Sequence, residues 1–176
     1  MNHKQLLRNQ LRNKRKNIDD KQRVVAEDLI NRYLRCFIRR DMKIAVYRAV
    51  GSEVSLNVFI RMALRRGVQV FEPVVDVNSR RLWFVKWGSI LHYRHVIKQR
   101  IENMDIVLLP LIGVDSAGMR LGQGGGYYDA SLSFCDKKEL LKIGVGFACQ
   151  MVDKLPSDKH DKKLDAFVCE MGVKSF

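Results

Sequence analysis

The sequence predicts an α/β fold, in which helices cover both faces of a mostly parallel sheet of about six strands. Two observations predict this class. Apolar residues with helical spacing alternate along the chain with short, strand-like apolar segments. One segment, "MDIVLLPLIGVD" (104–115), is almost continuously apolar, which is typical of a strand that is covered on both faces. We therefore expect a three-layer α/β/α sandwich of the Rossmann-like kind, with 104–115 inside its sheet.

The chain length of 176 residues suits a single domain (1–176) with a substantial core. Its composition, 47% hydrophobic and 29% charged, is ordinary for a globular protein. No apolar run approaches the ~20 residues that are needed to cross a bilayer. The N-terminus lacks the apolar core of a secretory signal. We expect a cytoplasmic, monomeric protein that does not associate with a membrane.

Two helices are expected at the N-terminus, at 3–16 and 20–39, because apolar residues recur there every three or four positions. The segment "NIDD" separates them, and Asp19 or Asp20 suits an N-cap. A strand, "KIAVYRAV", is expected next, at 43–50.

A third helix is expected from about Ser52, since apolar residues share one face up to Gly67, which suits the left-handed residue that ends a helix. Pro73 is expected to close the strand that follows, whereas residues 88–104 show no clean period. Besides the segment at 104–115, the remaining strands are expected at 68–75, 81–87, 141–148 and 164–170.

The charge of the chain is strongly positive and uneven. The formal net charge is +13, and residues 1–40 contain 12 Lys and Arg against 4 Asp and Glu. A basic face attracts polyanions, which include RNA, DNA, nucleotides and polyglutamylated cofactors. Charge alone does not choose among them.

The cysteines are widely spaced, with no C-x-x-C motif and no adjacent histidine pattern. Neither a zinc site nor a disulfide framework is expected. Free cysteine usually behaves as a small hydrophobic residue. We expect buried, reduced thiols at Cys36, Cys135, Cys149 and Cys169.

The segment "GMRLGQGGGYYD" (118–129) follows the apolar strand and precedes a helix expected near Tyr127. It matches neither the P-loop nor the G-x-G-x-x-G spacing. A loop between strand and helix can nevertheless present backbone N–H groups to a phosphate, and glycines permit positive φ and close approach. Arg120 suits a bidentate grip on phosphate, and Asp129 suits Mg²⁺ bound together with substrate phosphates. A glycine-rich surface turn with an ordinary helix cap is the alternative.

Four segments occur in the order of a known family: "KQLLR" (4–8), "SEVSL" (52–56), "LLPLIGVDSAGMRLGQGGGYYDASL" (108–132) and "LPSDKHDKKLDAFV" (155–168). The third contains the pattern R-L-G-x-G-x-G-Y-Y-D after a strand that ends in proline. The chain thus resembles the 5-formyltetrahydrofolate cyclo-ligases, also called methenyltetrahydrofolate synthetases, over essentially its whole length.

The resemblance implies an ATP- and Mg²⁺-dependent conversion of 5-formyltetrahydrofolate to 5,10-methenyltetrahydrofolate, with release of ADP and phosphate. In the family's mechanism the formyl oxygen attacks the γ-phosphate and forms a phosphorylated imidate. N10 then attacks the formyl carbon, and phosphate leaves. The implied partners are ATP and a folate, including its polyglutamylated forms, with Mg²⁺ as cofactor and no specific nucleic acid.

The resemblance also implies the site residues. Arg120 and Tyr128 would be catalytic, and Asp129 and Asp161 would hold Mg²⁺. Folate would contact Tyr47, Arg48, Glu53 and Tyr127. ATP would contact Lys4, Arg8, Arg120, Leu121, Gly122, Gln123, Gly124, Gly125, Gly126, Tyr127 and Tyr128.

Each of these assignments has a structural alternative. Lys4 and Arg8 are four positions apart on one helix and can face one anion, but they could equally form a solvated basic face. The two tyrosines could both be core residues. Asp161 has basic neighbours and could be an isolated surface residue. Glu53 could simply be an acid in the first turn of a helix.

The chain departs from the family pattern on the folate side. Residues 88–104 lack the Glu-Pro of a G-I-x-E-P-like segment, and Leu56 stands where the family has Thr. Two other functions therefore remain open. One is a basic RNA-binding protein, although no RRM-like aromatic motif is present. The other is a folate-binding relative that hydrolyses ATP poorly or not at all.

Overall fold

The computed structural model describes residues 3–76, 78–89, 96–135, 139–156 and 161–176. Within these residues one sheet contains seven strands, in the spatial order β10 (Gly172–Ser175), β9 (Ala166–Cys169), β7 (Leu141–Val145), β4 (Ile106–Pro110), β1 (Lys43–Ala45), β2 (Gln69–Asp76) and β3 (Arg81–Lys86). The inner strands are parallel, and β10 and β3 run antiparallel at the two edges. The predicted α/β class and mostly parallel sheet are confirmed.

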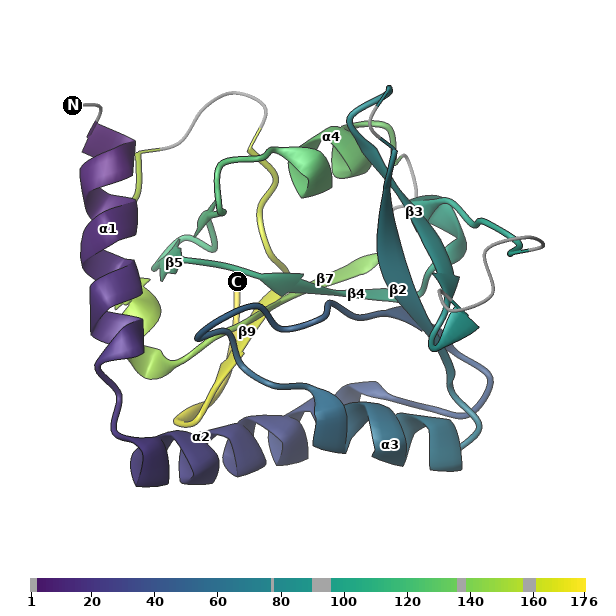
Figure 1. Cartoon of the computed structure of the whole chain (residues 1–176), viewed down its shortest axis with the longest axis horizontal. Helices are drawn as coiled ribbons and strands as arrows, with labels where there is room; N and C mark the ends of the chain where they lie inside the picture. Colours follow the sequence, from purple (N-terminus) through teal and green to yellow (C-terminus); the bar gives the residue numbers. More distant parts are fainter. Residues whose placement is uncertain (1–2, 77, 90–95, 136–138, 157–160) are drawn as a thin grey trace.

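The helices form layers on both faces of this sheet (Figure 1). Helices α2 (Asp20–Tyr33) and α3 (Asn57–Arg65) cover one face, and α4 (Tyr127–Ser133) covers the other. Helix α1 (His3–Lys16) packs through Leu11 against a smaller sheet, formed in the described residues by β6 (Arg120–Leu121), β5 (Gly113–Asp115) and β8 (Met151–Val152).

Strand β4 lies at the centre of the large sheet, between β7 and β1. Ile106 and Leu108 pack into the α2–α3 layer, whereas Val107 and Leu109 pack into the opposite layer. This burial on both faces explains the continuous apolar run in the sequence. The predicted interior position is confirmed, but the expected single strand is wrong, because the chain leaves the sheet after Pro110 and resumes as β5 in the smaller sheet.

Two polar side chains fix the adjoining helices. Asp19 is the N-cap of α2, as predicted, and accepts hydrogen bonds from the backbone N–H groups of Lys21 and Gln22. Asn31 on α2 accepts a hydrogen bond from the backbone N–H of Phe59 at 2.8 Å. Because the first turn of α3 has no cap from its own N-cap residue, Asn31 supplies this cap and ties α3 to α2.

Three expected boundaries are wrong. The strand expected at 43–50 ends at Ala45, and the following residues turn toward a pocket. The helix expected from Ser52 begins at Asn57, because Ser55 donates its N–H to Glu27 and accepts from Asn31 instead of continuing a helix. The helix expected at 20–39 ends at Tyr33 and tightens into a 3₁₀ turn, η1 (Leu34–Phe37).

The sequence suggested that Pro73 closes its strand. In the structure Pro73 instead lies inside β2, opposite Phe84. The pairing of β2 with β1 ends at Phe71, so at Pro73 no strand needs a backbone N–H on that side. Proline is therefore tolerated within the sheet, and its ring faces the pocket.

The C-terminal strand β10 was not expected, and it raises the strand number above the predicted six. In the aperiodic region, η3 (Ile101–Asn103) follows a single bridge between Gln99 and Phe84, and residues 90–95 lie outside the described residues. Burial was expected for all four cysteines, but only Cys169 is buried: Cys36 is exposed on η1, and Cys135 and Cys149 are partly buried. Across the described residues, no helix is both long and apolar enough to span a membrane.

Candidate active site

Every residue that the sequence predicted for the site lines one pocket of about 610 Å³. Helix α1 contributes Lys4 and Arg8, and the loop after β1 contributes Tyr47, Arg48 and Glu53. The segment from β6 into α4 and the residue Asp161 complete the predicted set. Because the parallel strands β1 and β4 both end here, the pocket occupies the usual ligand position of an open α/β sheet.

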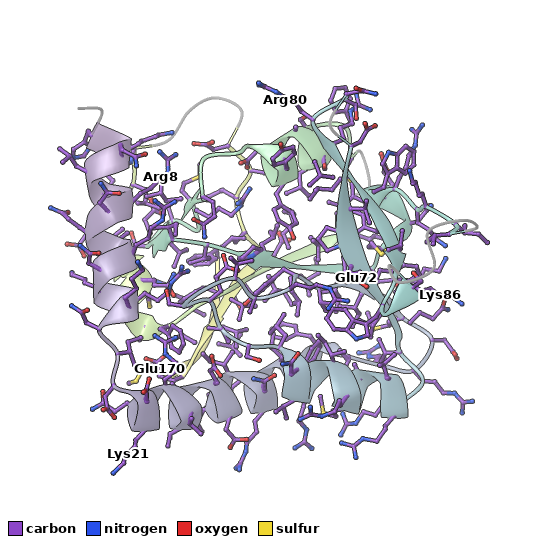
Figure 2. The ribbon with its side chains drawn as sticks, viewed as in Figure 1. Arg8, Lys21, Glu72, Arg80, Lys86 and Glu170 are labelled. Atoms are coloured by element: carbon purple, nitrogen blue, oxygen red, sulfur yellow. The ribbon has the colours of Figure 1, made fainter. Side chains whose placement is uncertain are left out.

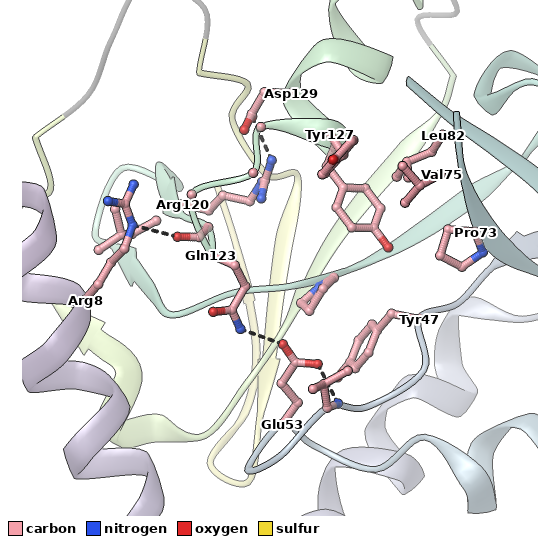
Figure 3. Close-up of a pocket in the computed structure, with 18 of the residues that line it drawn as sticks. Arg8, Tyr47, Glu53, Pro73, Val75, Leu82, Arg120, Gln123, Tyr127 and Asp129 are labelled. Atoms are coloured by element: carbon pink, nitrogen blue, oxygen red, sulfur yellow. Dashed lines mark hydrogen bonds and ion pairs between the residues drawn. The ribbon is translucent and has the colours of Figure 1, made fainter. Parts of the chain in front are cut away.

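One side of the pocket is polar and the other is apolar (Figure 3). Arg8, Arg120, Gln123 and Asp129 lie on the polar side, whereas the opposite wall is apolar. This wall contains residues that the sequence patterns did not assign to the site: Val50, Pro73, Val75, Leu82 and Pro110.

The glycine segment at 122–126 has the backbone geometry that its composition predicted. Gly124 has φ +109° and Gly126 has φ +68°, a region that side chains other than glycine rarely adopt. A Cβ on Gly125 would lie 2.9 Å from the ring of Tyr127. Nε of Arg8 donates to the carbonyl of Gly122 at 3.0 Å, so α1 holds the start of the segment.

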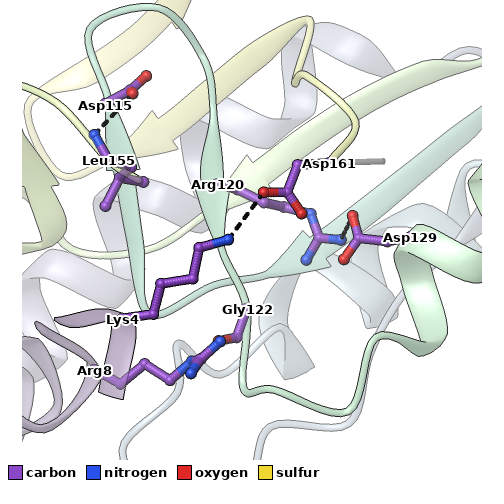
Figure 4. A network of polar contacts seen from close by, with 8 residues as sticks. All are labelled: Lys4, Arg8, Asp115, Arg120, Gly122, Asp129, Leu155 and Asp161. Carbon is purple, nitrogen blue, oxygen red and sulfur yellow. Dashed lines mark hydrogen bonds and ion pairs between the residues drawn. The ribbon is translucent and has the colours of Figure 1, made fainter. Parts of the chain in front are cut away.

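Arg120 is the buried cation of the polar side, with 4% of its side chain exposed. Its Nη2 donates to Oδ1 of Asp129 at 2.7 Å (Figure 4). Among the described residues, its buried Nε has no hydrogen-bond partner. Arg120 lines the pocket, and Asp129 accepts from only one of the five N–H donors of its guanidinium, so the side chain can also bind an anionic ligand.

The two predicted metal carboxylates both face the pocket, and each is paired with a cation. Nζ of Lys4 lies 3.3 Å from Oδ2 of Asp161, and Arg120 pairs with Asp129 (Figure 4). In the part of the chain that the structure describes, no three His, Cys, Asp or Glu side chains are grouped to hold a metal. Two carboxylates beside a phosphate-type loop do fit Mg²⁺, which commonly takes its remaining ligands from substrate phosphates and water.

Glu53 links the polar side of the pocket to the apolar side. Its Oε1 accepts a hydrogen bond from Nε2 of Gln123 at 2.8 Å, and its Oε2 accepts from the N–H of Val50 at 3.0 Å. Arg12 holds Gln123 in turn, donating to its side-chain oxygen at 2.8 Å. Since α3 begins only at Asn57, the alternative of a first-turn acid does not apply to Glu53.

The tyrosines of the pocket differ in what their hydroxyl groups do. Tyr47 is buried and donates to the carbonyl of Val54 at 3.0 Å, so it offers the pocket its ring. Tyr127 and Tyr128 are partly buried against the core, and both line the pocket. Burial raises the pKa of Tyr128 strongly, although Arg120 opposes this shift. The hydroxyl of Tyr128 is therefore protonated at neutral pH.

The structure also excludes the alternatives raised for Lys4, Arg8 and Asp161. Lys4 and Arg8 do not form a solvated face, because Lys4 contacts Asp161 and Arg8 contacts the glycine segment. Asp161 is not an isolated surface residue, since 23% of its side chain is exposed and it pairs with Lys4. The structure therefore brings all predicted residues together, while their roles stay a prediction.

Comparison with known proteins gives the family of this chain. The model of the 5-formyltetrahydrofolate cyclo-ligase family matches residues 1–170. The chain belongs to this family. A 5-formyltetrahydrofolate cyclo-ligase of Haemophilus influenzae is 27% identical over 92% of this chain and 94% of its own length. The same enzyme of Mus musculus is 27% identical over 73% of each chain.

Two solved structures share the fold. A 5,10-methenyltetrahydrofolate synthetase from Mycoplasma pneumoniae aligns with a TM-score of 0.83 at 25% identity, covering 96% of this chain and 99% of that one. The corresponding synthetase of Aquifex aeolicus aligns with a TM-score of 0.81 at 24% identity, covering 98% and 92%. The likeness thus extends over nearly the whole of both chains.

Proposed function

We propose that this chain converts 5-formyltetrahydrofolate to 5,10-methenyltetrahydrofolate in an ATP- and Mg²⁺-dependent reaction that releases ADP and phosphate. One observation carries the proposal: a single pocket joins a glycine segment with cations and two carboxylates to an apolar wall. The first half suits the phosphates of ATP, and the second suits a folate. Membership of the cyclo-ligase family supports the same reaction.

The polar half of the pocket would bind ATP. Lys4, Arg8 and Arg120 supply positive charge from two directions, and the glycine segment supplies backbone N–H groups with no Cβ in the way. Asp129 and Asp161 would hold Mg²⁺, whose charge would neutralise the phosphate oxygens.

The apolar half would bind the folate. Val50 and Val75 line the pocket with 72% and 46% of their surface exposed, which is apolar area that a ligand can cover. Tyr47 and Pro73 present ring faces to the same space. The carboxylate of Glu53 can accept N–H donors of a pterin once Gln123 releases it.

The reaction needs two events, for which the residues supply positioning and charge. The formyl oxygen attacks the γ-phosphorus and ADP leaves, which gives a phosphorylated imidate. N10 then attacks the imidate carbon and loses its proton, the C–O bond breaks, and phosphate leaves with the formyl oxygen. Arg120 would stabilise charge on the transferred phosphoryl group, and the neutral hydroxyl of Tyr128 would donate to the same group. We place this reaction in the cytoplasm and expect a monomeric enzyme.

The test is an absorbance assay for the methenyl product with purified protein and 5-formyltetrahydrofolate. We expect product only when ATP and Mg²⁺ are both present. ADP should form in equal amount, because one phosphoryl transfer accompanies each ring closure. Folate binding without product would favour the folate-binding relative, and product formed without ATP would contradict the mechanism.

Replacing Asp161 with asparagine tests the metal assignment. The change keeps the volume and an oxygen acceptor for Lys4 but removes one negative charge. A unit charge about 4 Å from a cation contributes about 1–4 kcal/mol near a protein surface. We expect the Mg²⁺ concentration for half-maximal turnover to rise roughly tenfold or more. Asp129→Asn should act similarly, and asparagine is preferable to alanine there because buried Arg120 needs an acceptor.

Asp165→Asn is the matched control for this experiment. Asp165 also pairs with a lysine, Lys142, at 2.7 Å, and its side chain is 40% exposed, but it does not line the pocket. Its replacement should leave the Mg²⁺ dependence of turnover unchanged. If Asp161→Asn and Asp129→Asn also leave it unchanged, the metal assignment is wrong.

A further inference from the structure

We propose that Arg48, held by Glu72 and Trp87, recognises the glutamyl carboxylates of the folate and so determines substrate specificity, an inference that rests on the proposed function. Arg48 lines the pocket beside Tyr47. Its two holding residues lie on β2 and at the end of β3, outside the glycine segment and outside α1. This assigns one charged residue to one chemical group of the substrate.

The guanidinium of Arg48 is fixed on two sides. Nε and Nη2 donate to the two oxygens of Glu72, with Nη2 3.1 Å from Oε1, and the guanidinium carbon lies 4.4 Å from the ring centroid of Trp87. Glu72 lies on β2 (Figure 2). Its side chain is fully buried and also accepts from the N–H of Gly88 at 2.9 Å. This fork-to-fork pairing, stacked on an aromatic face, holds the guanidinium in one orientation.

The pairing leaves donors of Arg48 directed away from Glu72. Bidentate contact uses Nε and one N–H of Nη2, whereas a guanidinium has five N–H donors. Within the described residues, Nη1 donates to no protein acceptor. The side chain of Arg48 remains 56% exposed although its partner is completely buried. The pair therefore presents its positive end outward.

Arg48 is also the cation of the apolar half of the pocket. Among the described residues that line the pocket, the other cations are Lys4 and Arg8 on α1 and Arg120 in β6. Those three serve the phosphate end. Arg48 directly follows Tyr47 in the loop after β1, and both residues line the pocket.

A reduced folate has a chemistry that matches this distribution. Its ring system and aminobenzoyl group are flat and mostly apolar, and its glutamyl group ends in carboxylates. A ligand with its formyl group toward Arg120 and its rings along the apolar wall would bring its anionic end to a cation beyond the rings. Planar bidentate donors suit a carboxylate better than a point charge does.

The experiment compares two ligands, 5-formyltetrahydrofolate and the primary amide of 5-formyltetrahydropteroate, which lacks the glutamyl group and has no carboxylate. Equilibrium binding of each is measured for the unmodified protein and for the double variant Arg48→Gln with Glu72→Gln. Both residues are changed because removal of Arg48 alone would leave a buried carboxylate without its partner. The variant Arg48→Lys is measured in parallel, since lysine keeps the charge and loses the planar fork.

We expect the unmodified protein to bind the folate about tenfold or more tightly than the pteroate amide, as for one good charge-assisted contact. The double variant should bind both ligands with the affinity of the pteroate amide, and Arg48→Lys should recover only part of the difference. Equal affinity of the unmodified protein for both ligands, no binding of either, or an equal loss of both in the double variant would overturn the proposal. Ligand affinity is measured separately from turnover. The role of Arg48 can therefore be tested even if the protein forms no methenyl product.

Discussion

Replacing Gly124 with valine is expected to reduce ATP-dependent turnover about 100-fold or more, as small misplacements of reacting groups do. Gly124 has φ +109°, where a β-branched residue is strongly disfavoured. Steric room is not the obstacle, because a Cβ would lie 3.8 Å from the nearest atom of Arg8, an ordinary contact. The backbone would have to change, and the N–H groups of the segment would lose the directions that the proposed phosphate binding requires.

Gly172→Val separates this effect from a loss of stability. Gly172 has φ +127° at the start of β10, and no atom lies within 4 Å of the position a Cβ would take. Both substitutions should lower the free energy of unfolding by about 1–3 kcal/mol, the usual cost of such strain. Thermal melting and turnover are measured on both proteins. If the two variants lose turnover equally, the glycine segment has no special part in ATP use.

Much of the fold could be predicted because it depends on local signals. The apolar run at 106–110 marks a strand buried on both faces, and Asp19 marks the start of α2. The end of β1 at Ala45 gives no such signal, since Val46 and Tyr47 are as apolar as the strand and are buried as well. The residues that follow make contacts with residues distant in sequence, among them the pairing of Arg48 with Glu72.

The site divides in the same way. Its polar half is mostly contiguous in sequence, so a short motif around 120–129 could predict it. Its apolar wall is assembled from four separate segments, and Pro73, Val75 and Leu82 look in the sequence like ordinary strand residues. Only the pairing of β2 with β3, beyond the end of β1, places them in the pocket. For the same reason the sequence did not predict a role for Glu72, which is a charged residue inside a strand.

Replacing Arg120 with lysine is expected to lower kcat by about 100- to 1000-fold, the effect of losing one donor that stabilises transition-state charge. The positive charge is kept, but the planar set of donors is lost. In the structure Nη2 of Arg120 donates to Asp129, and the buried Nε has no hydrogen-bond partner among the described residues. Lysine can satisfy Asp129, but it cannot also present a second donor in a fixed direction to the phosphoryl group.

Arg15→Lys is the matched control, because Arg15 is also buried but does not line the pocket. It donates to Oγ of Ser52 at 3.0 Å and to the carbonyl of Leu111 at 3.2 Å. Both lysine variants should lower the melting temperature, since each loses hydrogen bonds of a buried guanidinium. Only Arg120→Lys should lose turnover at saturating ATP and folate. A fully active Arg120→Lys protein would show that Arg120 supports the glycine segment structurally and takes no part in phosphoryl transfer.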